Sequence, residues 1–394
     1  MDEDRSPAKL WNIGFIYLLV VNSFNSIAFG MIAPLLPGYL VSMGATLAFS
    51  GLATGVFSVT ALFVRPMAGI LGDRLNKKKL LIITMSLTGL SITLYSLIPA
   101  AVWMIPVRIL HGVVFSLSGT LFIALGADYI PQNRLGEGVG FLSVGQILGM
   151  ALGPNIAIDF MERFSYELCF IFSGTIILIS GLSLIALRYD RPVTIKPENK
   201  SKRAFHLSEF VAKELLPNMF FGAVFIVSNG LLNSYLVLMG IERGINSIGL
   251  FFIVNAVVLL FARPFIGRLT DRKGVAYAAF PGYILAAATM MIIGFSHTLW
   301  PILIAAVFAA VGVGGALPAL QADCFRILGS QRKTVATGTY MIGMDLGMTI
   351  GQVLGGVVIG SAGFTVAFGG AGILMLIGFV LYLIYHRLAK PPCL

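Results

Sequence analysis

Residues 65–79 read RPMAGILGDRLNKKK, and a closely related stretch, RPFIGRLTDRKG, occupies residues 263–274. The two copies lie 198 positions apart in a chain of 394 residues, which is about half of its length. Six residues of the first copy recur at this offset: Arg65, Pro66, Gly69, Leu71, Asp73 and Arg74 correspond to Arg263, Pro264, Gly267, Leu269, Asp271 and Arg272. A motif repeated at half the chain length predicts a tandem duplication of one folding unit.

The composition around these copies is that of a membrane protein. Hydrophobic residues make up 57% of the chain, charged residues 11%, and the mean hydropathy is +0.92, which excludes a soluble domain. A helix needs about 20 apolar residues to cross the hydrocarbon core. Polar residues divide the chain into twelve such runs, at 12–41, 48–71, 79–99, 101–125, 135–159, 165–187, 215–239, 246–267, 275–296, 300–324, 334–359 and 364–386.

The basic residues predict the orientation of these helices. The two tails and alternate connections carry 22 of the 27 Lys and Arg residues, whereas the opposite connections carry Arg163 and Arg243. This is the positive-inside pattern, so both termini are expected in the cytoplasm. The net charge of +10 then reflects membrane topology, and we expect contact with anionic lipid and no binding of nucleic acid.

The predicted fold is an all-α membrane protein of twelve transmembrane helices in two pseudo-symmetric six-helix halves. The halves are residues 1–187 and 214–394, and the polar segment 188–213 is the cytoplasmic linker between them. The three cysteines are scattered and form no CxxC pair, so we expect no disulfide, no metal site and no bound cofactor.

The repeated motif has residues suited to a mechanical role. Gly69 and Gly267 come near the end of an apolar run, where a missing side chain lets a neighbouring helix approach closely. The charged residues that follow are expected at the membrane surface, where an acid can face a helix N-terminus or pair with a base. These residues, predicted to latch the cytoplasmic face, are Asp73, Arg74, Asp271 and Arg272. The alternative is a short loop whose charges only set the topology.

This motif resembles the signature between helices 2 and 3 of the major facilitator superfamily of transporters, which recurs more weakly between helices 8 and 9. The resemblance covers essentially the whole chain. It implies two halves that rock about a central substrate cavity, in a protein that commonly works as a monomer and is not an enzyme. Arg65 and Arg263 lie about seven residues before the cytoplasmic end of their helices, roughly 10 Å inside. We assign them to gating, with substrate contact as the alternative.

The fourth apolar run contains VRILHG, with Arg108 and His111 inside the membrane. Ionisable groups at that depth are functional candidates. The spacing from Arg108 to Gly112 resembles the helix-4 motif of proton-coupled facilitators, in which the arginine influences proton transfer, although His111 stands where a glutamine is common. His111 can titrate near neutral pH; the alternative is a packing role.

The fifth run places Gly145, Gly149 and Gly153 at four-residue intervals, which predicts a groove for close helix packing, and Pro154 predicts a kink at its exit. The segment resembles the helix-5 signature of the antiporter branch of this superfamily. The glycine pair that closes the signature is missing, since Ala157 and Ile158 follow Ile156.

Amides and hydroxyls inside the first, fifth and seventh runs predict a polar cavity, because such groups in hydrocarbon must face other helices or water. Asn22 and Asn25 share one helical face, as do Asn229 and Asn233. Interhelical hydrogen bonds are the alternative. The predicted cavity residues are Asn22, Asn25, Gln146, Asn229, Asn233, Tyr235 and Asp345.

Asp345 is the most informative of these residues. It lies about eleven residues, roughly 16 Å, from the cytoplasmic start of the eleventh run, close to the membrane midplane. A carboxylate at that depth can be neutral or charged according to its partner and its access to water, as a proton carrier or a site for a cation requires. The alternative is a structural pair with a base such as Arg108.

Together these features predict a secondary transporter that exports small amphipathic or cationic molecules in exchange for protons. Asp345, Arg108 and His111 would couple the protons. An exporter of zwitterionic opine-type metallophores, to which the eleventh run is similar, and a sugar or organic-anion transporter remain alternatives within the class. An intramembrane enzyme would need convergent acids, a metal cluster or an activated nucleophile, and a receptor would need a signalling domain; neither is evident in the sequence.

Overall fold

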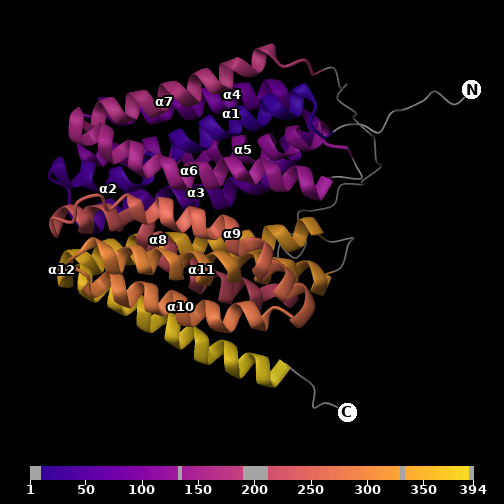
Figure 1. Cartoon of the computed structure of the whole chain (residues 1–394). Helices are drawn as coiled ribbons and strands as arrows, with labels where there is room; N and C mark the ends of the chain where they lie inside the picture. Colours follow the sequence, from indigo (N-terminus) through magenta and orange to yellow (C-terminus); the bar gives the residue numbers. More distant parts are fainter. Residues whose placement is uncertain (1–9, 132–134, 190–211, 329–332, 390–394) are drawn as a thin grey trace, which may run out of the picture. The chain divides into compact units, whose positions relative to one another are not determined.

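The computed structural model describes residues 10–131, 135–189, 212–328 and 333–389, and regular structure in these ranges is helical (Figure 1). The helices before the linker are α1 (Ile13–Gly30), α2 (Ile32–Ser42), α3 (Leu47–Arg74), α4 (Lys77–Thr93), α5 (Met104–Asp128), α6 (Leu135–Arg163) and α7 (Tyr166–Ser183). Those after it are α8 (Leu216–Glu242), α9 (Leu250–Lys273), α10 (Ala276–Phe295), α11 (Leu299–Leu328) and α12 (Lys333–Ala389). Short 3₁₀ turns extend several of them: η1 (Leu94–Leu97), η2 (Ala101–Trp103), η4 (Leu184–Ala186) and η6 (Lys213–Leu215).

The apolar runs of the sequence correspond to these helices, with one local difference: the first run is divided at Met31 into α1 and α2. The last two runs are two helices that meet at Gly363, where φ is +84° and ψ is 171°, and together they carry the label α12. Glycine adopts a positive φ readily because it has no Cβ, and so the chain can turn sharply between these two helices. Within the described ranges, nine helical stretches are long and apolar enough to span a membrane, and the 51-residue stretch Gly338–Leu388 holds two of the predicted runs.

The described residues form two compact units that do not follow chain order. Unit 1 contains the described residues of 1–32, 63–99 and 106–199, and unit 2 contains those of 33–62, 100–105 and 200–394. Thus α2 and the first part of α3 pack with the second half of the chain, across the boundary expected from the repeat. The division into halves at 188–213 stays a prediction.

Unit 1 is built around α1, which packs against α6 and α7, while α4 packs along α7 (Figure 1). Ser173 of α7 donates a 2.6 Å hydrogen bond to the carbonyl oxygen of Ala28 of α1. In the α6–α1 contact, a Cβ built on any glycine of the groove would meet the backbone of α1. The groove glycines are Gly145, Gly149 and Gly153, and they face Asn22, Ser26 and Gly30. α6 runs on as a helix past Pro154 to Arg163.

Unit 2 repeats this arrangement with α8 and α12. The glycines at 343, 347 and 351 stand 198 positions after those of α6, and they meet the α8 backbone at Met219, Ala223 and Val227. A fourth glycine, Gly355, meets the Leu231 side chain one turn further on. The same close contact between first and fifth helices therefore occurs in both repeats. Beside it, α10 packs against α11 and α12, and Phe225 stacks on Tyr283 at 4.1 Å between ring centroids.

Candidate functional site

A buried polar cluster in unit 1 joins Arg108 and His111 through Tyr95. Arg108 and His111 lie three residues apart on α5, 5% and 0% exposed, and Tyr95 comes from η1 at the end of α4 and is also 0% exposed. Arg108 Nη1 donates a hydrogen bond to the Tyr95 hydroxyl at 3.2 Å. That hydroxyl lies 2.5 Å from His111 Nδ1. The sequence indicated the arginine and the histidine but gave no signal for the tyrosine that connects them.

Aromatic side chains from neighbouring helices enclose this cluster. Phe29 of α1 stacks on Phe115 of α5 with 4.3 Å between centroids, and both contact the His111 ring edge-on. Phe170 of α7 contacts Tyr95 edge-on at 5.5 Å. A fixed positive charge is thus held in an apolar environment, where the electrostatic influence of a charge is much stronger than in water.

Asp345 lies in unit 2, 12 residues after the start of α12 and roughly 18 Å along it. Its side chain is partly exposed. Thr349, one turn further, donates to the Asp345 carbonyl oxygen at 2.9 Å. Thr349 and Val353 contact α3 at Gly55, where a Cβ would lie 2.6 Å from the Val353 side chain. Because 345, 349 and 353 are spaced by four, Asp345 is on the α12 face that packs on α3.

Two of the predicted cavity residues, Asn22 and Tyr235, donate hydrogen bonds to backbone carbonyl oxygens, and four others are partly exposed or exposed. The Asn22 amide donates to the Leu142 carbonyl oxygen of α6 at 2.7 Å, which is the interhelical bond considered as the alternative. Tyr235 is buried, and its hydroxyl donates to the Gln352 carbonyl oxygen at 2.9 Å. The partly exposed or exposed members are Asn25, Asn229, Asn233 and Gln146. Asn229 and Asn233 belong to unit 2, with Asp345, whereas Asn25 and Gln146 belong to unit 1.

The two copies of the repeated motif remain helical up to Arg74 and Lys273, at the ends of α3 and α9. Arg65 is partly buried, and Arg263 and Arg272 are exposed. Among the described residues, no atom lies within 4 Å of a Cβ built on Gly267. The close helix approach expected at Gly267 stays a prediction. The side chains of the remaining gating residues, Gly69, Asp73, Arg74 and Asp271, lie outside the described part of the chain.

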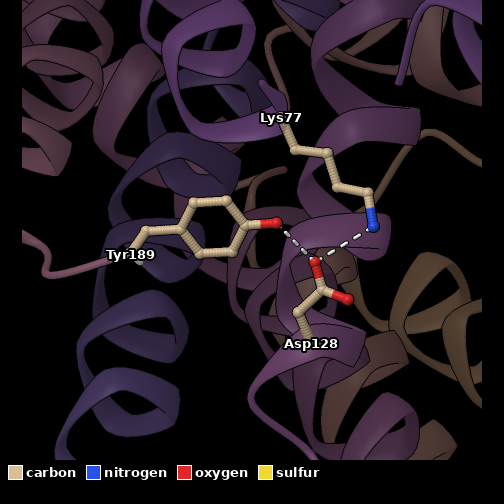
Figure 2. Close-up of polar contacts among 3 residues, drawn as sticks. All are labelled: Lys77, Asp128 and Tyr189. Atoms are coloured by element: carbon tan, nitrogen blue, oxygen red, sulfur yellow. Dashed lines mark hydrogen bonds and ion pairs between the residues drawn. The ribbon is translucent and has the colours of Figure 1, made fainter. Parts of the chain in front are cut away.

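A second polar cluster includes Lys77 of the first motif copy (Figure 2). Lys77, at the start of α4, places its Nζ 3.0 Å from Asp128 Oδ2 at the end of α5. Tyr189, in the segment that follows α7, donates to the same oxygen at 2.8 Å. The aspartate thus fastens α4 to the segment that follows α7. Asp128 has a counterpart in the second repeat, Asp323, which lies 195 positions later near the end of α11.

In unit 2 the equivalent aspartate has a neutral partner. Asn218, 3% exposed near the start of α8, donates to Asp323 Oδ2 at 2.9 Å and to the Leu320 carbonyl oxygen at 3.3 Å. In the described ranges, no group of three or more His, Cys, Asp or Glu side chains is placed to hold a metal ion.

Comparison with known proteins gives the family to which this architecture belongs. The family model described as the Major Facilitator Superfamily matches residues 18–274 and 219–392. An MFS-type transporter of Methanocaldococcus jannaschii, MJ1560, is 25% identical over 86% of this chain and 89% of its own length. The multidrug resistance protein MdtG of Citrobacter koseri is 26% identical over 86% of this chain and 87% of its own length.

A solved structure agrees on the fold. The crystal structure of a POT family transporter in complex with 5-aminolevulinic acid superimposes with a TM-score of 0.81 at 14% identity, over 98% of this chain and 99% of that one. The match of the family model extends over far more than half of the sequence. The chain therefore belongs to the Major Facilitator Superfamily, and it is a multi-pass membrane protein and a secondary transporter of a small-molecule substrate.

Proposed function

We propose that this transporter is a proton-coupled exporter of small amphipathic or cationic molecules, and that it acts as a monomer by alternating access. The observation that carries the proposal is the position of Asp345: a partly exposed carboxyl group roughly 18 Å along a membrane-spanning helix. The similarity to a protein named for multidrug resistance supports the direction and the substrate class. The distribution of 22 basic residues on one side supports a plasma-membrane protein with both termini in the cytoplasm.

The reasoning for Asp345 starts from the energy of a charge in the membrane. A charged side chain near the bilayer centre is costly unless it is paired or reaches water. A carboxyl group there changes between its charged and neutral forms when its surroundings change. It can therefore bind either a proton or a cationic substrate, but not both at once. Such competition for one carboxyl group is the simplest way to exchange a substrate for a proton.

The packing of α12 supports a coupling of this exchange to movement. Asp345 lies between Gly343 and Gly347, which hold α12 tightly on α8. The opposite face of α12, which carries Asp345, packs on the first part of α3. A change of charge at Asp345 thus occurs at the edge of a helix contact, where it alters the free energy of keeping that contact closed.

In the proposed cycle, a proton arriving from outside neutralises Asp345 and releases the substrate, and deprotonation on the inside readies the site for the next molecule. Asn25, Asn229, Asn233 and Gln146 would contribute substrate contacts. Arg108 would set the electrostatic potential in the membrane core. Arg65, Gly69, Asp73, Arg74, Arg263, Gly267, Asp271 and Arg272 would close the cytoplasmic side.

Proton movement in sealed, inverted vesicles that hold a pH gradient tests this proposal. Lipophilic cations, neutral drugs, sugars and zwitterionic amino-acid derivatives are added in turn. We expect a cation or amphipathic drug to dissipate the gradient with the wild type and not with Asp345→Asn. Asp159→Asn is the matched control, because Asp159 is an exposed acid at the end of α6 and pairs only with Arg163 in the described contacts.

A second measurement separates loss of coupling from loss of folding. Substrate exchange at equal pH on both sides does not require net proton transfer, so Asp345→Asn should retain it while losing accumulation driven by the gradient. If a compound crosses the membrane with wild-type protein and leaves the pH gradient intact, the proposal of proton coupling is wrong.

A further inference from the structure

The hydrogen bonds among Arg108, Tyr95 and His111 have a definite direction. A guanidinium group has donors and no acceptor, so the 3.2 Å contact from Arg108 Nη1 uses a lone pair of the Tyr95 oxygen. The 2.5 Å contact between the Tyr95 hydroxyl and His111 Nδ1 contains one hydrogen, which belongs either to the tyrosine or to the histidine.

The positive charge of Arg108 decides whether Tyr95 or His111 donates this hydrogen. A cation that donates to the Tyr95 oxygen polarises its O–H bond and makes the hydroxyl a stronger donor, since hydrogen bonds in a chain reinforce one another. In the reverse arrangement, His111 Nδ1–H would donate to the Tyr95 oxygen, which already accepts a hydrogen bond from the Arg108 cation. If His111 were doubly protonated, a second positive charge would lie beside Arg108 in a fully buried place.

The groups that face His111 from the surrounding elements favour the same arrangement. Around the His111 ring lie Arg108 and Phe115 from α5, Tyr95 from η1 and Phe29 from α1. Behind Tyr95, α7 presents Phe170. The described contacts thus place a cation, a hydroxyl and three aromatic rings around the imidazole.

We propose that Tyr95 is a positioning residue that accepts a hydrogen bond from Arg108 and donates one to His111 Nδ1, and so holds His111 as the neutral Nε2–H imidazole. The transported proton is then not carried by His111, although the sequence suggested it. Tyr95 also fixes the guanidinium group of Arg108 within unit 1. This inference rests on the proposed function only for its effect on transport, since the tautomer is a property of the folded chain.

Solid-state ¹⁵N NMR of the histidine-labelled, full-length protein in lipid bilayers tests the tautomer directly. The chain has four histidines, at 111, 206, 297 and 386, and His111→Gln identifies the signals of His111. We expect the wild-type spectrum to show His111 Nε2 protonated and Nδ1 unprotonated, unchanged as the pH is lowered from neutral to mildly acidic. An Nδ1–H or an imidazolium signal from wild-type His111 overturns the proposal.

The same spectra of Tyr95→Phe test the cause. Loss of the hydroxyl should give a mixture of the two neutral His111 tautomers, because the donor that selects one of them is gone. Tyr283→Phe is the matched control, because Tyr283 is also 0% exposed and its hydroxyl donates to the Phe221 carbonyl oxygen at 3.2 Å in unit 2. An unchanged His111 spectrum in folded Tyr95→Phe overturns the positioning role. Should that variant not fold, the wild-type spectrum alone decides the direction of the chain.

Transport measurements add a readout that a purely structural role would not change. Proton-driven accumulation of substrate by Tyr95→Phe should fall below that of wild type and Tyr283→Phe, because the Arg108 guanidinium group loses an acceptor that fixes its position. Substrate exchange at equal pH on both sides should be retained. If Asp345→Asn proves to be fully coupled while these spectra behave as expected, the proposed function is wrong and the role of Tyr95 stands.

Discussion

The side-chain amide of Asn218 donates a hydrogen bond to Asp323 Oδ2 at 2.9 Å, and so fastens the start of α8 to the end of α11. Unit 1 contains a related bond, in which the Asn12 amide at the start of α1 donates to the Tyr129 carbonyl oxygen just after α5, at 2.8 Å. Both repeats therefore use an asparagine to hold the first helix to the end of the fourth. The acceptor is a carboxylate in one repeat and a backbone carbonyl in the other.

We expect Asn218→Ala to lower the free energy of unfolding by about 1.5–3 kcal/mol, because it removes a buried hydrogen bond to a charged group. Asn255→Ala is the control, since in the described contacts the Asn255 amide donates to a neutral acceptor, the Ala306 carbonyl oxygen, at 3.1 Å, and its loss should cost about 1 kcal/mol. Unfolding of both variants in detergent micelles measures the difference. Equal losses would show that the charge of Asp323 adds nothing to this contact.

The glycine grooves should not tolerate a methyl group. A Cβ at Gly149 or Gly347 would overlap the backbone of Ser26 or Ala223, and overpacking of this kind typically costs about 1–3 kcal/mol. We expect Gly149→Ala and Gly347→Ala to unfold at lower temperature than wild type.

Two exposed helical glycines serve as controls for these variants. Among the described residues, nothing lies within 4 Å of a Cβ built on Gly119 of α5 or Gly370 of α12. Alanine at such a site should stabilise the helix by about 0.5–1 kcal/mol. If all four alanine variants behave alike, close packing is not the reason for the glycines.

The contributions of Lys77, Asp128 and Tyr189 to the free energy of unfolding should depend on one another, because the three side chains form one half-buried cluster. The side chains of Lys77 and Asp128 are 23% and 16% exposed, and Tyr189 shares the acceptor oxygen. A double-mutant cycle of Lys77→Met and Asp128→Asn should give an interaction energy of about 0.5–3 kcal/mol, as contacting residues in a network do.

The exposed pair of Arg163 and Asp159, 69% and 61% exposed, provides the comparison for this cycle. A pair of that kind contributes about 0.3–0.5 kcal/mol. Tyr189→Phe should reduce the Lys77–Asp128 interaction energy, because the hydroxyl helps to orient the carboxylate. An interaction energy as small as that of the exposed pair would mean that the cluster is merely a surface contact.

Arg243 should not be replaceable by lysine. Its guanidinium group donates to the carbonyl oxygens of Ile293, Gly294 and Ser296 at the end of α10, and to Thr365 Oγ1 at 3.0 Å. Burial lowers the pKa of Arg243, and the adjacent Glu242 carboxylate opposes that shift. These bonds use the planar fork of arginine, which an ammonium group cannot reproduce.

We expect Arg243→Lys to destabilise unit 2 by about 1–3 kcal/mol, because buried carbonyl groups lose their donors. Thermal unfolding of Arg243→Lys and of Arg163→Lys measures the effect, and the second variant, at an exposed site, should be neutral. Since arginine and lysine are both charged at neutral pH, the difference should not change between about pH 6 and pH 8. A lysine variant as stable as wild type would contradict the role of the fork.

The sequence was sufficient for the membrane-spanning helices and for the repeat. Hydrocarbon offers no hydrogen-bond partners to the backbone, so an apolar run of about 20 residues must be helical, and the predicted runs match the observed helices to within a few residues over most of their length. The groove residues Gly145, Gly149 and Gly153 were also recognisable, because four-residue spacing is a local property of one helix. The position of Asp345 along its helix is likewise a local property of the sequence.

Contacts between helices were decided only by the tertiary structure. A helix that is apolar on every side has no polar face to indicate its rotation, since lipid is as apolar as the protein interior. For this reason the sequence did not show that Tyr95 joins Arg108 to His111, or that Asn22 binds α6. It also did not show that α2 and the first part of α3 pack with the second half of the chain. The sequence determined how far along its helix each polar group lies, and the packing of the helices decided which partner it meets.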